Sequence, residues 1–413
     1  MATPLPTPAQ LRYQDWELGL FLHFGLRTFY EGWEDMDKRP MSPAAFDPTQ
    51  LDCRSWAEAA KKAGFGYMVM TTKHHCGFAN WPSKTTDFSV ASSPWKRGKG
   101  DVVREFTDAC REFGLGVGLY YSPFDAASPV YGDAKAYDDY FIAQIGEILE
   151  PYGRIDILWF DGCGSAGHEY DWPRILAEIR RMQPDVLLFN ADGIRWVGNE
   201  DGYAPLGTRN VVPGLGNSMV SADATPLWLP AECDCRMRWR RWFYSDADAN
   251  TVKSVDELMG MYYYSVGRGC TMLLNIGPDR RGLLPDADRT RLLEFGDEIR
   301  RRFGSPLATL RDFTRDGNSW EYTSKTFLLV DHVVVAEDIA KGEHVFRFAI
   351  HAGAQEAITV YEGRTVGHKT VCRFPPIRTR GLRFEVIEAE GDVELRALEL
   401  HGTCKDTIMV PLV

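Results

Sequence analysis

The stretch IDILWFDG, residues 155–162, decides how the rest of the chain is interpreted. It is a short apolar run that ends in a carboxylate and a glycine, and such a run predicts a strand buried on both faces, as in parallel sheets. Side chains two apart on a strand share a face, so Trp159 and Asp161 are expected to point the same way. An acid at the C-terminal tip of a barrel strand is in the usual position for catalysis, although an Asp there can also cap a helix.

Similar apolar runs recur as far as residue 278, with amphipathic segments of helical period between most of them. The expected strands are residues 18–25, 66–75, 116–122, 155–162, 186–190 and 270–278, the last being the final barrel strand. The signal is weaker at residues 194–200 and 227–232, two segments that each end in a glutamate. The expected helices are residues 55–63, 101–113, 137–149, 172–182, 255–266 and 286–303. Connections of this length allow parallel pairing, so the alternation predicts an α/β barrel domain over residues 1–304.

The pattern changes at about Ser305. Short β-type runs such as TFLLV (326–330) and HVFRF (344–348) are separated by Gly and Asp, and no clear helical segment interrupts them. In the second run, Val345 and Arg347 fall on one face of the expected strand. This pattern predicts an antiparallel β-sandwich over residues 305–413, which either binds carbohydrate or caps the barrel.

Composition excludes several classes of partner. The formal net charge of −11 argues against binding to nucleic acid or to an anionic membrane. Residues 1–10 lack the pattern of a signal peptide, and no apolar run approaches membrane-spanning length. The nine cysteines include no Cys-x-x-Cys pair, so we expect reduced thiols in a cytoplasmic protein. The oligomeric state is not indicated.

Histidines follow two of the expected strands. His23 ends the run at 18–25, and the pair His74 and His75 ends the run at 66–75. The His-x-His and His-Glu-x-x-His spacings that support zinc binding are absent, which favours hydrogen bonding to a polar ligand. The loop YEGWED at residues 30–35, which follows the first strand, is a candidate rim of the same site.

Paired carboxylic groups are the other requirement of a sugar-cleaving site. A retaining glycosidase needs two carboxyl groups about 5 Å apart, one as an ionised nucleophile and one as a proton donor. Strand-tip acids of a barrel converge on one cleft, so Asp161 is the first candidate. Glu200 and Glu232, each at the end of an apolar segment, are the candidates for the second carboxyl group.

Five motifs in a fixed order carry a family resemblance. They are FLHFG (21–25), TKHHCGF (72–78), GLYYS (118–122), LWFDG (158–162) and LNIGP (274–278). Together, from about Leu11 to Phe303, they resemble glycoside hydrolase family 29, the α-L-fucosidases. The segments RWVGNEDG (195–202), PAECD (230–234) and WFY (242–244) resemble subfamily B, which acts on α-1,3/1,4-linked fucose.

The resemblance implies a (β/α)8-type, TIM-like barrel and a role for each matching residue. Asp161 is then the nucleophile of a retaining reaction and Glu200 the general acid/base, with no metal or other cofactor required. The expected sugar-binding residues are His23, His74, His75, Tyr121 and Trp159. Outside the matching motifs, we also expect Trp33, Glu34, Glu232 and Arg238 to contact the substrate.

The chain departs from the family pattern at three places. Cys76 follows the paired histidines where an acid is common, and the loop after the first strand reads Gly32-Trp33-Glu34 instead of containing Glu-Trp. The run RMRWRR at residues 236–241 is unusually basic. These departures bear on the preference for the aglycone, the group to which fucose is attached, more than on the reaction.

The expected function is therefore a retaining exo-α-L-fucosidase that releases terminal α-1,3/1,4-linked L-fucose from oligosaccharides or glycoconjugates. One alternative is a metal-dependent barrel hydrolase that uses His23, His74, His75 and Asp161. The other is a sugar-binding barrel without catalysis, against which the intact pair of Asp161 and Glu200 argues.

Overall fold

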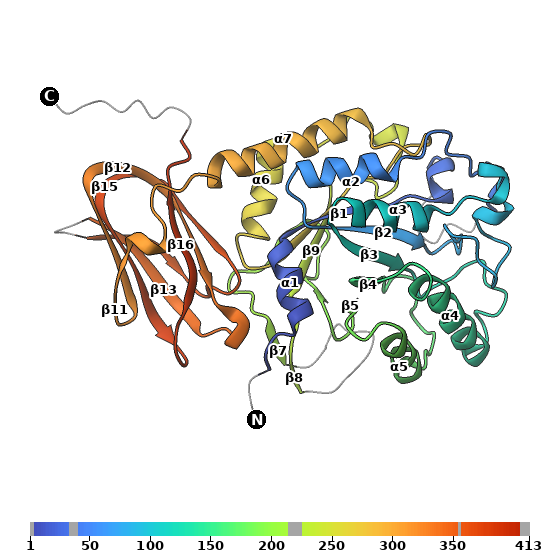
Figure 1. Ribbon diagram of the computed structural model, residues 1–413, viewed down its shortest axis with the longest axis horizontal. Helices are drawn as coiled ribbons and strands as arrows, with labels where there is room; N and C mark the ends of the chain where they lie inside the picture. Colours follow the sequence, from blue (N-terminus) through green and yellow to red (C-terminus); the bar gives the residue numbers. More distant parts are fainter. Residues whose placement is uncertain (1–3, 33–39, 214–224, 354–356, 405–413) are drawn as a thin grey trace.

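The computed structural model describes residues 4–32, 40–213, 225–353 and 357–404. An α/β barrel lies beside a C-terminal antiparallel sheet (Figure 1). The expected fold class, a (β/α)8-type barrel followed by an antiparallel β-domain, is confirmed. Within the described ranges, none of the helices combines the length and apolar character needed to cross a membrane.

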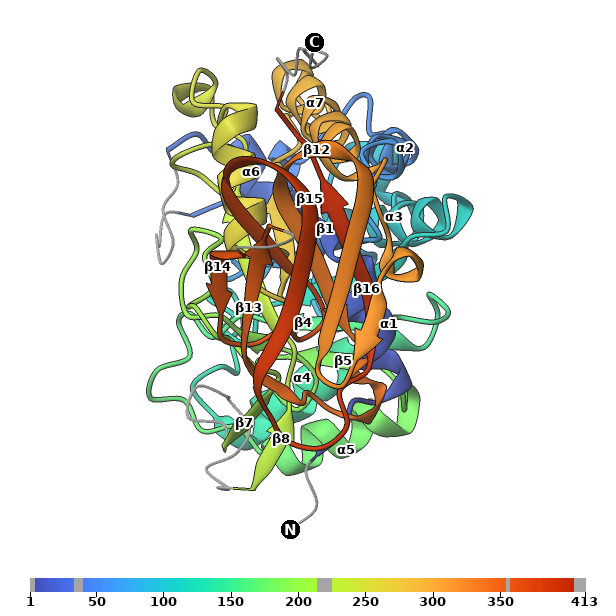
Figure 2. The same ribbon diagram turned by 90° about the vertical axis from the view of Figure 1, so that its left-hand side faces the viewer.

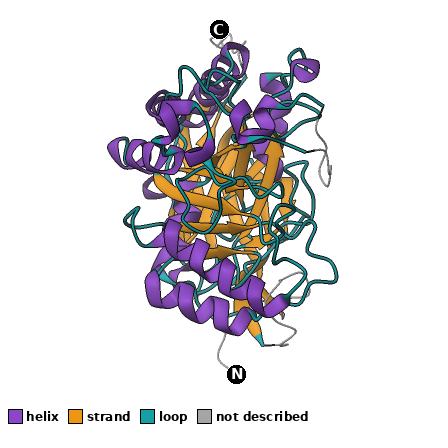
Figure 3. Ribbon diagram, turned by 90° about the vertical axis from the view of Figure 1, so that its right-hand side faces the viewer, coloured by secondary structure: helices purple, strands orange, loops and turns teal. Residues whose placement is uncertain are grey.

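Eight parallel strands form the nearly closed barrel sheet, and the helices lie outside it (Figure 3). The strands follow one another in the order β5-β4-β3-β2-β1-β10-β9-β6. Their bounds are β1 Leu18–Leu22, β2 Tyr67–Lys73, β3 Gly116–Tyr121, β4 Ile157–Phe160, β5 Leu187–Phe189, β6 Arg195–Trp196, β9 Ala231–Arg236 and β10 Thr271–Asn275. Every residue of β1 to β5 and of β10 is buried, as expected for a parallel sheet covered on both faces.

Helices connect most of these strands, and each expected helix is present within a few residues of its predicted bounds. They are α2 Cys53–Lys62, α3 Val102–Glu112, α4 Ala134–Leu149, α5 Trp172–Met182, α6 Val255–Tyr264 and α7 Asp286–Phe303. Local chemistry sets their ends: the side chain of Asp101 caps α3 by accepting from the backbone N–H of Arg104. The segment from β5 to β9 differs, because its described part holds a short antiparallel pair, β7 (Val211–Pro213) and β8 (Pro226–Trp228), instead of a helix.

Alternation along the strands divides the barrel core into two layers. Tyr120 and Trp159 belong to the cluster that fills the barrel interior. Their neighbours Tyr121 and Phe160 belong to the larger cluster between the strands and the helices. Because successive side chains point to opposite faces, a shift of one residue decides whether a side chain faces the barrel axis or a helix.

A further helix, α1 (Pro8–Trp16), was not expected from the sequence. It begins with Thr7 as a capping residue and has Pro8 in its first turn. The amide of Gln10 donates to the backbone carbonyls of Gly193 and Trp228, and Tyr13 is buried in the barrel interior. The helix therefore packs against the segment leading into β6 and the end of β8 and extends the interior cluster.

The C-terminal sheet is antiparallel and has its own core (Figure 2). Its strands are β11 Thr314–Asp316, β12 Ser319–Glu337, β13 Val345–Ala352, β14 Ile358–Gly363, β15 Thr370–Ala389 and β16 Leu395–His401. The main order is β11-β12-β15-β13-β14, and β16 pairs with β12. The division of the chain at residues 304 and 305 stays a prediction.

Candidate active site

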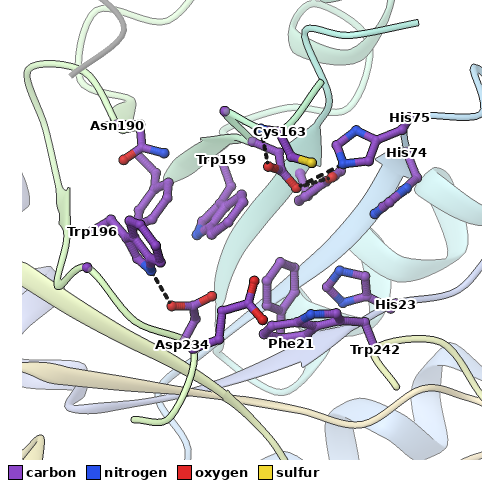
Figure 4. A pocket seen from close by; sticks show the side chains of 16 residues that line it. Phe21, His23, His74, His75, Trp159, Cys163, Asn190, Trp196, Asp234 and Trp242 are labelled. Carbon is purple, nitrogen blue, oxygen red and sulfur yellow. Dashed lines mark hydrogen bonds and ion pairs between the residues drawn. The ribbon is translucent and has the colours of Figure 1, made fainter. Parts of the chain in front are cut away.

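A pocket of about 440 Å³ opens at the C-terminal ends of the barrel strands (Figure 4). Its histidines lie on one side, and Asn190, Trp196 and Asp234 lie on the other. The lining residues are Phe21, His23, His74, His75, Tyr120, Trp159, Asp161, Gly162, Cys163, Phe189, Asn190, Trp196, Gly198, Glu200, Asp234 and Trp242. Six of the expected site residues are therefore brought together: His23, His74, His75, Trp159, Asp161 and Glu200.

Asp161 follows directly after β4, so the register of the parallel sheet sets its position. Its Oδ2 accepts a hydrogen bond of 2.7 Å from the hydroxyl of Tyr120 and lies 3.5 Å from Nε2 of His75. Its Oδ1 accepts a hydrogen bond of 2.8 Å from the backbone N–H of Cys163. Donors on both oxygens fix the orientation of the carboxylate, as a nucleophile requires.

The hydrogen-bond partners of His75 set its tautomer. The hydroxyl of Ser122 donates to the carbonyl of Phe124, so its oxygen accepts the hydrogen bond of 2.6 Å from Nδ1 of His75. The proton of this ring therefore lies on Nδ1, and Nε2 faces Asp161.

His74 has the opposite tautomer. The guanidinium of Arg27 has no acceptor and lies 3.0 Å from Nδ1 of His74, so Nδ1 accepts and the ring proton lies on Nε2. Burial, followed by the neighbouring His75 and Arg27, holds the pKa of His74 well below its usual range. His74 is thus a neutral ring whose Nε2–H can donate to a hydroxyl group.

His23 presents an acceptor. The amide nitrogen of Asn275 donates to the backbone carbonyl of Trp242, which leaves the amide oxygen for Nδ1 of His23 at 2.7 Å. That nitrogen must therefore carry the proton, and Nε2 keeps its lone pair. The three rings together offer both a donor and acceptors, which suits a ligand with several hydroxyl groups.

Three of these side chains are also close enough to share a metal ion. Ligand atoms of His74, His75 and Asp161 lie within 4.8 Å of one another. Metal binding through Nε2 of His74 would move its proton to Nδ1, against the guanidinium of Arg27. The donor set is therefore poorly suited to a metal as it stands, because one of its three members already has the opposing tautomer.

Glu232 lies below the pocket instead of lining it. Residues 227–232 span the end of β8 and the start of β9, so Glu232 is the second residue of β9, deep in the barrel. It is fully buried; its Oε1 accepts from the indole of Trp159 at 2.7 Å, and its Oε2 from the hydroxyls of Tyr13 and Tyr67. Burial raises the pKa of Glu232. Its visible role is to hold Trp159, which is stacked between Tyr120 and Phe189.

Asp234 is a lining residue that the sequence analysis did not select. It lies two residues beyond Glu232, and its Oδ1 accepts a hydrogen bond of 2.7 Å from the indole of Trp196. Burial, with smaller contributions from Glu232 and Glu200, raises the pKa of Asp234 well above its usual range. The period of two along a strand places Asp234 on the same face as Glu232, and this signal was present in the sequence.

Glu200 reaches the pocket from a loop, four residues after β6. Asn199 shapes this loop, because its Oδ1 accepts from the backbone N–H groups of Asp201 and Tyr203. Asp201 also forms an isolated bridge with Cys235 of β9. The side chain of Glu200 is 49% exposed, and its Oε2 lies 3.8 Å from Nη1 of Arg236.

Besides Glu232, two further expected substrate contacts are placed elsewhere. Tyr121 is buried between β3 and α4, where its hydroxyl donates to Gln144, and its neighbour Tyr120 lines the pocket instead. Arg238 forms a buried ion pair with Asp288 of α7, at 2.8 Å between Nη2 and Oδ2. Tyr121 faces the helices because side chains alternate along β3. Arg238 is directed away from the pocket because it lies beyond the end of β9. The expected contacts Trp33 and Glu34 lie outside the described residues.

Comparisons with known proteins agree with this geometry. The family model for alpha-L-fucosidases matches residues 32–302. A putative alpha-L-fucosidase 1 of Oryza sativa subsp. japonica is 35% identical, over 94% of this chain and 83% of that protein. A glycoside hydrolase 29 family member from an unknown rumen bacterium superposes with a TM-score of 0.88 at 33% identity, covering 99% of this chain and 79% of the other. A Ruminococcus gnavus GH29 fucosidase solved in complex with fucose gives a TM-score of 0.88 at 27% identity, with 98% and 97% covered.

Proposed function

Because this chain belongs to the alpha-L-fucosidase family, glycoside hydrolase family 29, we propose that it is a retaining exo-enzyme for terminal α-1,3/1,4-linked L-fucose. The observation that carries the proposal is the environment of Asp161. Its carboxylate accepts hydrogen bonds from the hydroxyl of Tyr120 and from the backbone N–H of Cys163, and it lies in the same pocket as Glu200.

The reaction then proceeds in two displacements. In the first, Asp161 attacks the anomeric carbon of fucose while Glu200 gives a proton to the glycosidic oxygen, and the aglycone leaves as an alcohol. In the second, Glu200 takes a proton from water, the water attacks the same carbon, and the bond to Asp161 breaks. Two inversions give fucose with the original configuration.

The rest of the pocket is suited to recognise fucose. The Nε2–H of His74 donates to a sugar hydroxyl, and the lone pair of His23 accepts from another. The rings of Phe21, Trp159 and Trp242 offer apolar walls for the methyl group and for the apolar face of the sugar.

The linkage preference rests on the loop that carries Glu200. Residues 195–202 resemble the subfamily acting on α-1,3/1,4-linked fucose, and three residues of this segment, Trp196, Gly198 and Glu200, line the pocket. Cleavage of a Lewis-type trisaccharide should therefore exceed cleavage of an α-1,2-linked fucoside. Equal or preferential cleavage of the α-1,2 linkage would contradict the linkage proposal but leave the fucosidase proposal standing.

A metal-dependent hydrolase is the second candidate, because His74, His75 and Asp161 lie close together. The tautomer of His74 opposes it, so we expect full activity after prolonged dialysis against a strong chelator. Activity that is lost on dialysis and restored by a divalent ion would favour the metal-dependent candidate.

The proposed function is tested by assaying an aryl α-L-fucoside and the Lewis-type trisaccharide while following the released sugar by NMR. The α-anomer should appear first and then mutarotate. Release of the β-anomer would contradict retention, and absence of any fucose release would contradict the proposed function itself.

A further inference from the structure

A second cavity, of about 230 Å³, adjoins the catalytic pocket. The two share Glu200 and Trp242 as lining residues. Among the described residues that line the second cavity, Glu200 is the one carboxylate and four are arginines: Arg27, Arg236, Arg240 and Arg241. A cavity with this lining is unexpected in a chain whose formal net charge is −11.

Most of the arginines come from the basic run at residues 236–241, and Arg238 of that run forms an ion pair away from the cavity. Arg238 is buried against Asp288, with Nε and Nη2 both within 3 Å of its oxygens. Arg236, Arg240 and Arg241 line the cavity instead. Strand geometry explains the split in part, because Arg236 shares the inward face of β9 with Asp234 and so reaches the mouth of the barrel.

Nearby carboxylates are engaged in the framework around the cavity. Asp248 accepts from the backbone N–H groups of Arg240 and Arg241 through its Oδ2. Asp246 and Glu31 bind the two terminal nitrogens of Arg280. None of these three acids is a lining residue of the cavity in the described part of the chain.

The position of Glu200 indicates which part of the substrate the second cavity would hold. A general acid must face the glycosidic oxygen, which belongs to the leaving group, so a cavity on the far side of Glu200 receives the aglycone. The side chain of Arg236 is fixed there: its Nη1 donates to the carbonyl of Arg240, and its guanidinium lies 5.2 Å from the ring centroid of Trp242.

We propose that the arginine-lined cavity is an aglycone subsite for an acidic sugar. The inference rests on the proposed function, and it names the substrate class: a fucosylated glycan that carries a carboxylate or a sulfate ester beside the fucose branch. Guanidinium groups bind both anions in a planar, bidentate manner, so arginine is the side chain expected in such a subsite.

The test compares three substrates that share one fucosylated core and differ in the acidic group attached to it. They are the neutral Lewis-type trisaccharide, the same glycan with a terminal sialic acid, and the same glycan with a sulfate ester on its galactose. The expected result is a kcat/KM on at least one acidic glycan that exceeds the neutral value on the order of tenfold, mainly through KM. The two acidic substrates tell which anion the subsite takes.

The variants are Arg240→Gln and the double variant Arg240→Gln/Arg241→Gln. Arg236 is kept, because it lies 3.8 Å from Glu200 and its loss would disturb the general acid. Arg289→Gln on α7 is the matched control, since it removes the same charge from an exposed position that lines neither cavity. The ratio of acidic to neutral kcat/KM should fall in the single variant, fall further in the double variant and stay at the wild-type value in the control.

Salt supplies an independent measurement. Raising the ionic strength from 0.1 to 1 M shortens the Debye length from about 10 to about 3 Å, so the acidic preference should shrink while neutral cleavage changes little. Equal kcat/KM values for neutral and acidic glycans, or a ratio unaffected by the double variant, would overturn the acidic subsite alone. A chain that cleaves none of the fucosides would overturn the proposed function and the subsite with it.

Discussion

The two sides of the pocket are built differently. Asp161 directly follows a fully buried strand, is 23% exposed and is held by donors on both oxygens. Glu200 is four residues beyond the short strand β6, is 49% exposed and lies in a loop beside Arg236. The first carboxylate takes its position from the sheet, and the second takes its position from a loop.

The difference matches the two chemical roles proposed for these residues. A nucleophile works from one fixed position in one charge state, which a buried frame of donors provides. A general acid/base must exchange protons with solvent in each cycle and face leaving groups of different shape, which an exposed loop allows.

Strand β9 joins the two sides. Glu232 holds Trp159, which lies two residues before Asp161, and Asp234 holds Trp196, which lies four residues before Glu200. Both carboxyl groups project from one face of the same strand, so one strand supports both segments to which a catalytic role is proposed.

The largest expected effect concerns Asp161, the carboxylate positioned by the sheet. Asp161→Gly should lower turnover on the order of 10³-fold or more while the fold is retained, because the nucleophile is lost and few other contacts change. Azide should restore turnover by entering the vacated space. Near wild-type activity without azide would remove Asp161 from its proposed role.

For Glu200, the carboxylate positioned by a loop, the loss of activity on substitution should depend on the leaving group. Glu200→Ala should lose about a hundredfold or more on the trisaccharide but much less on an aryl fucoside with an acidic phenol, which needs little protonation. Glu232→Ala and Asp234→Asn should lower activity on both substrates to a similar extent. Glu232 and Asp234 hydrogen-bond to Trp159 and Trp196 and do not protonate the leaving group. If Asp234→Asn, and not Glu200→Ala, lost much more activity on the trisaccharide than on the aryl fucoside, Asp234 would be the general acid.

The neighbouring pair Tyr120 and Tyr121 sharpens the comparison, since both are buried and only one reaches the site. Tyr120→Phe removes a donor to Asp161, and the loss of a hydrogen bond to a charged group should lower kcat/KM by about tenfold or more. Tyr121→Phe should leave the kinetics near wild type and lower the free energy of unfolding by about 1–2 kcal/mol, because it removes the hydrogen bond to Gln144. A reversed pattern would restore Tyr121 as the sugar contact.

The smallest effect is on the pH dependence of stability. Because the pKa of Asp234 is raised in the folded state, the folded protein binds this proton more tightly than the unfolded chain does. The free energy of unfolding therefore falls as pH rises from about 3.9, the unfolded value, towards the raised pKa. Asp234→Asn should remove this part of the slope, measured as the difference between variant and wild-type melting curves at several pH values. An unchanged slope would mean that Asp234 titrates normally.

Much of the fold was predictable because it follows from periodicity. Buried apolar runs and amphipathic segments identified β1 to β5, β10 and six helices in outline, and the signal was weak at β6 and β9. Helix α1 was missed, since its mixed surface carries little amphipathic signal and its cap, Thr7, precedes a proline-rich start. The signal was weak at residues 227–232 because this segment spans two short strands, β8 and β9, which are separated by only two residues.

Site residues were predictable where they end a strand. His23, His74, His75 and Asp161 are all near strand tips and reach the pocket. Asp234 and Tyr120 could have been found by continuing the alternation along β9 and β3. Arg238 could not, because its pairing with Asp288 depends on how α7 packs.

The central claim is that Asp161 forms a covalent bond to fucose. Its most direct test is peptide mapping by mass spectrometry after incubation with 2-deoxy-2-fluoro-α-L-fucosyl fluoride, which slows the second displacement more than it slows the first. The account predicts one fluorofucosyl group on the peptide that contains Asp161, and none on the peptide that contains Glu200. An enzyme that turns over fucosides but carries no adduct, or carries it on Glu200, would contradict the account.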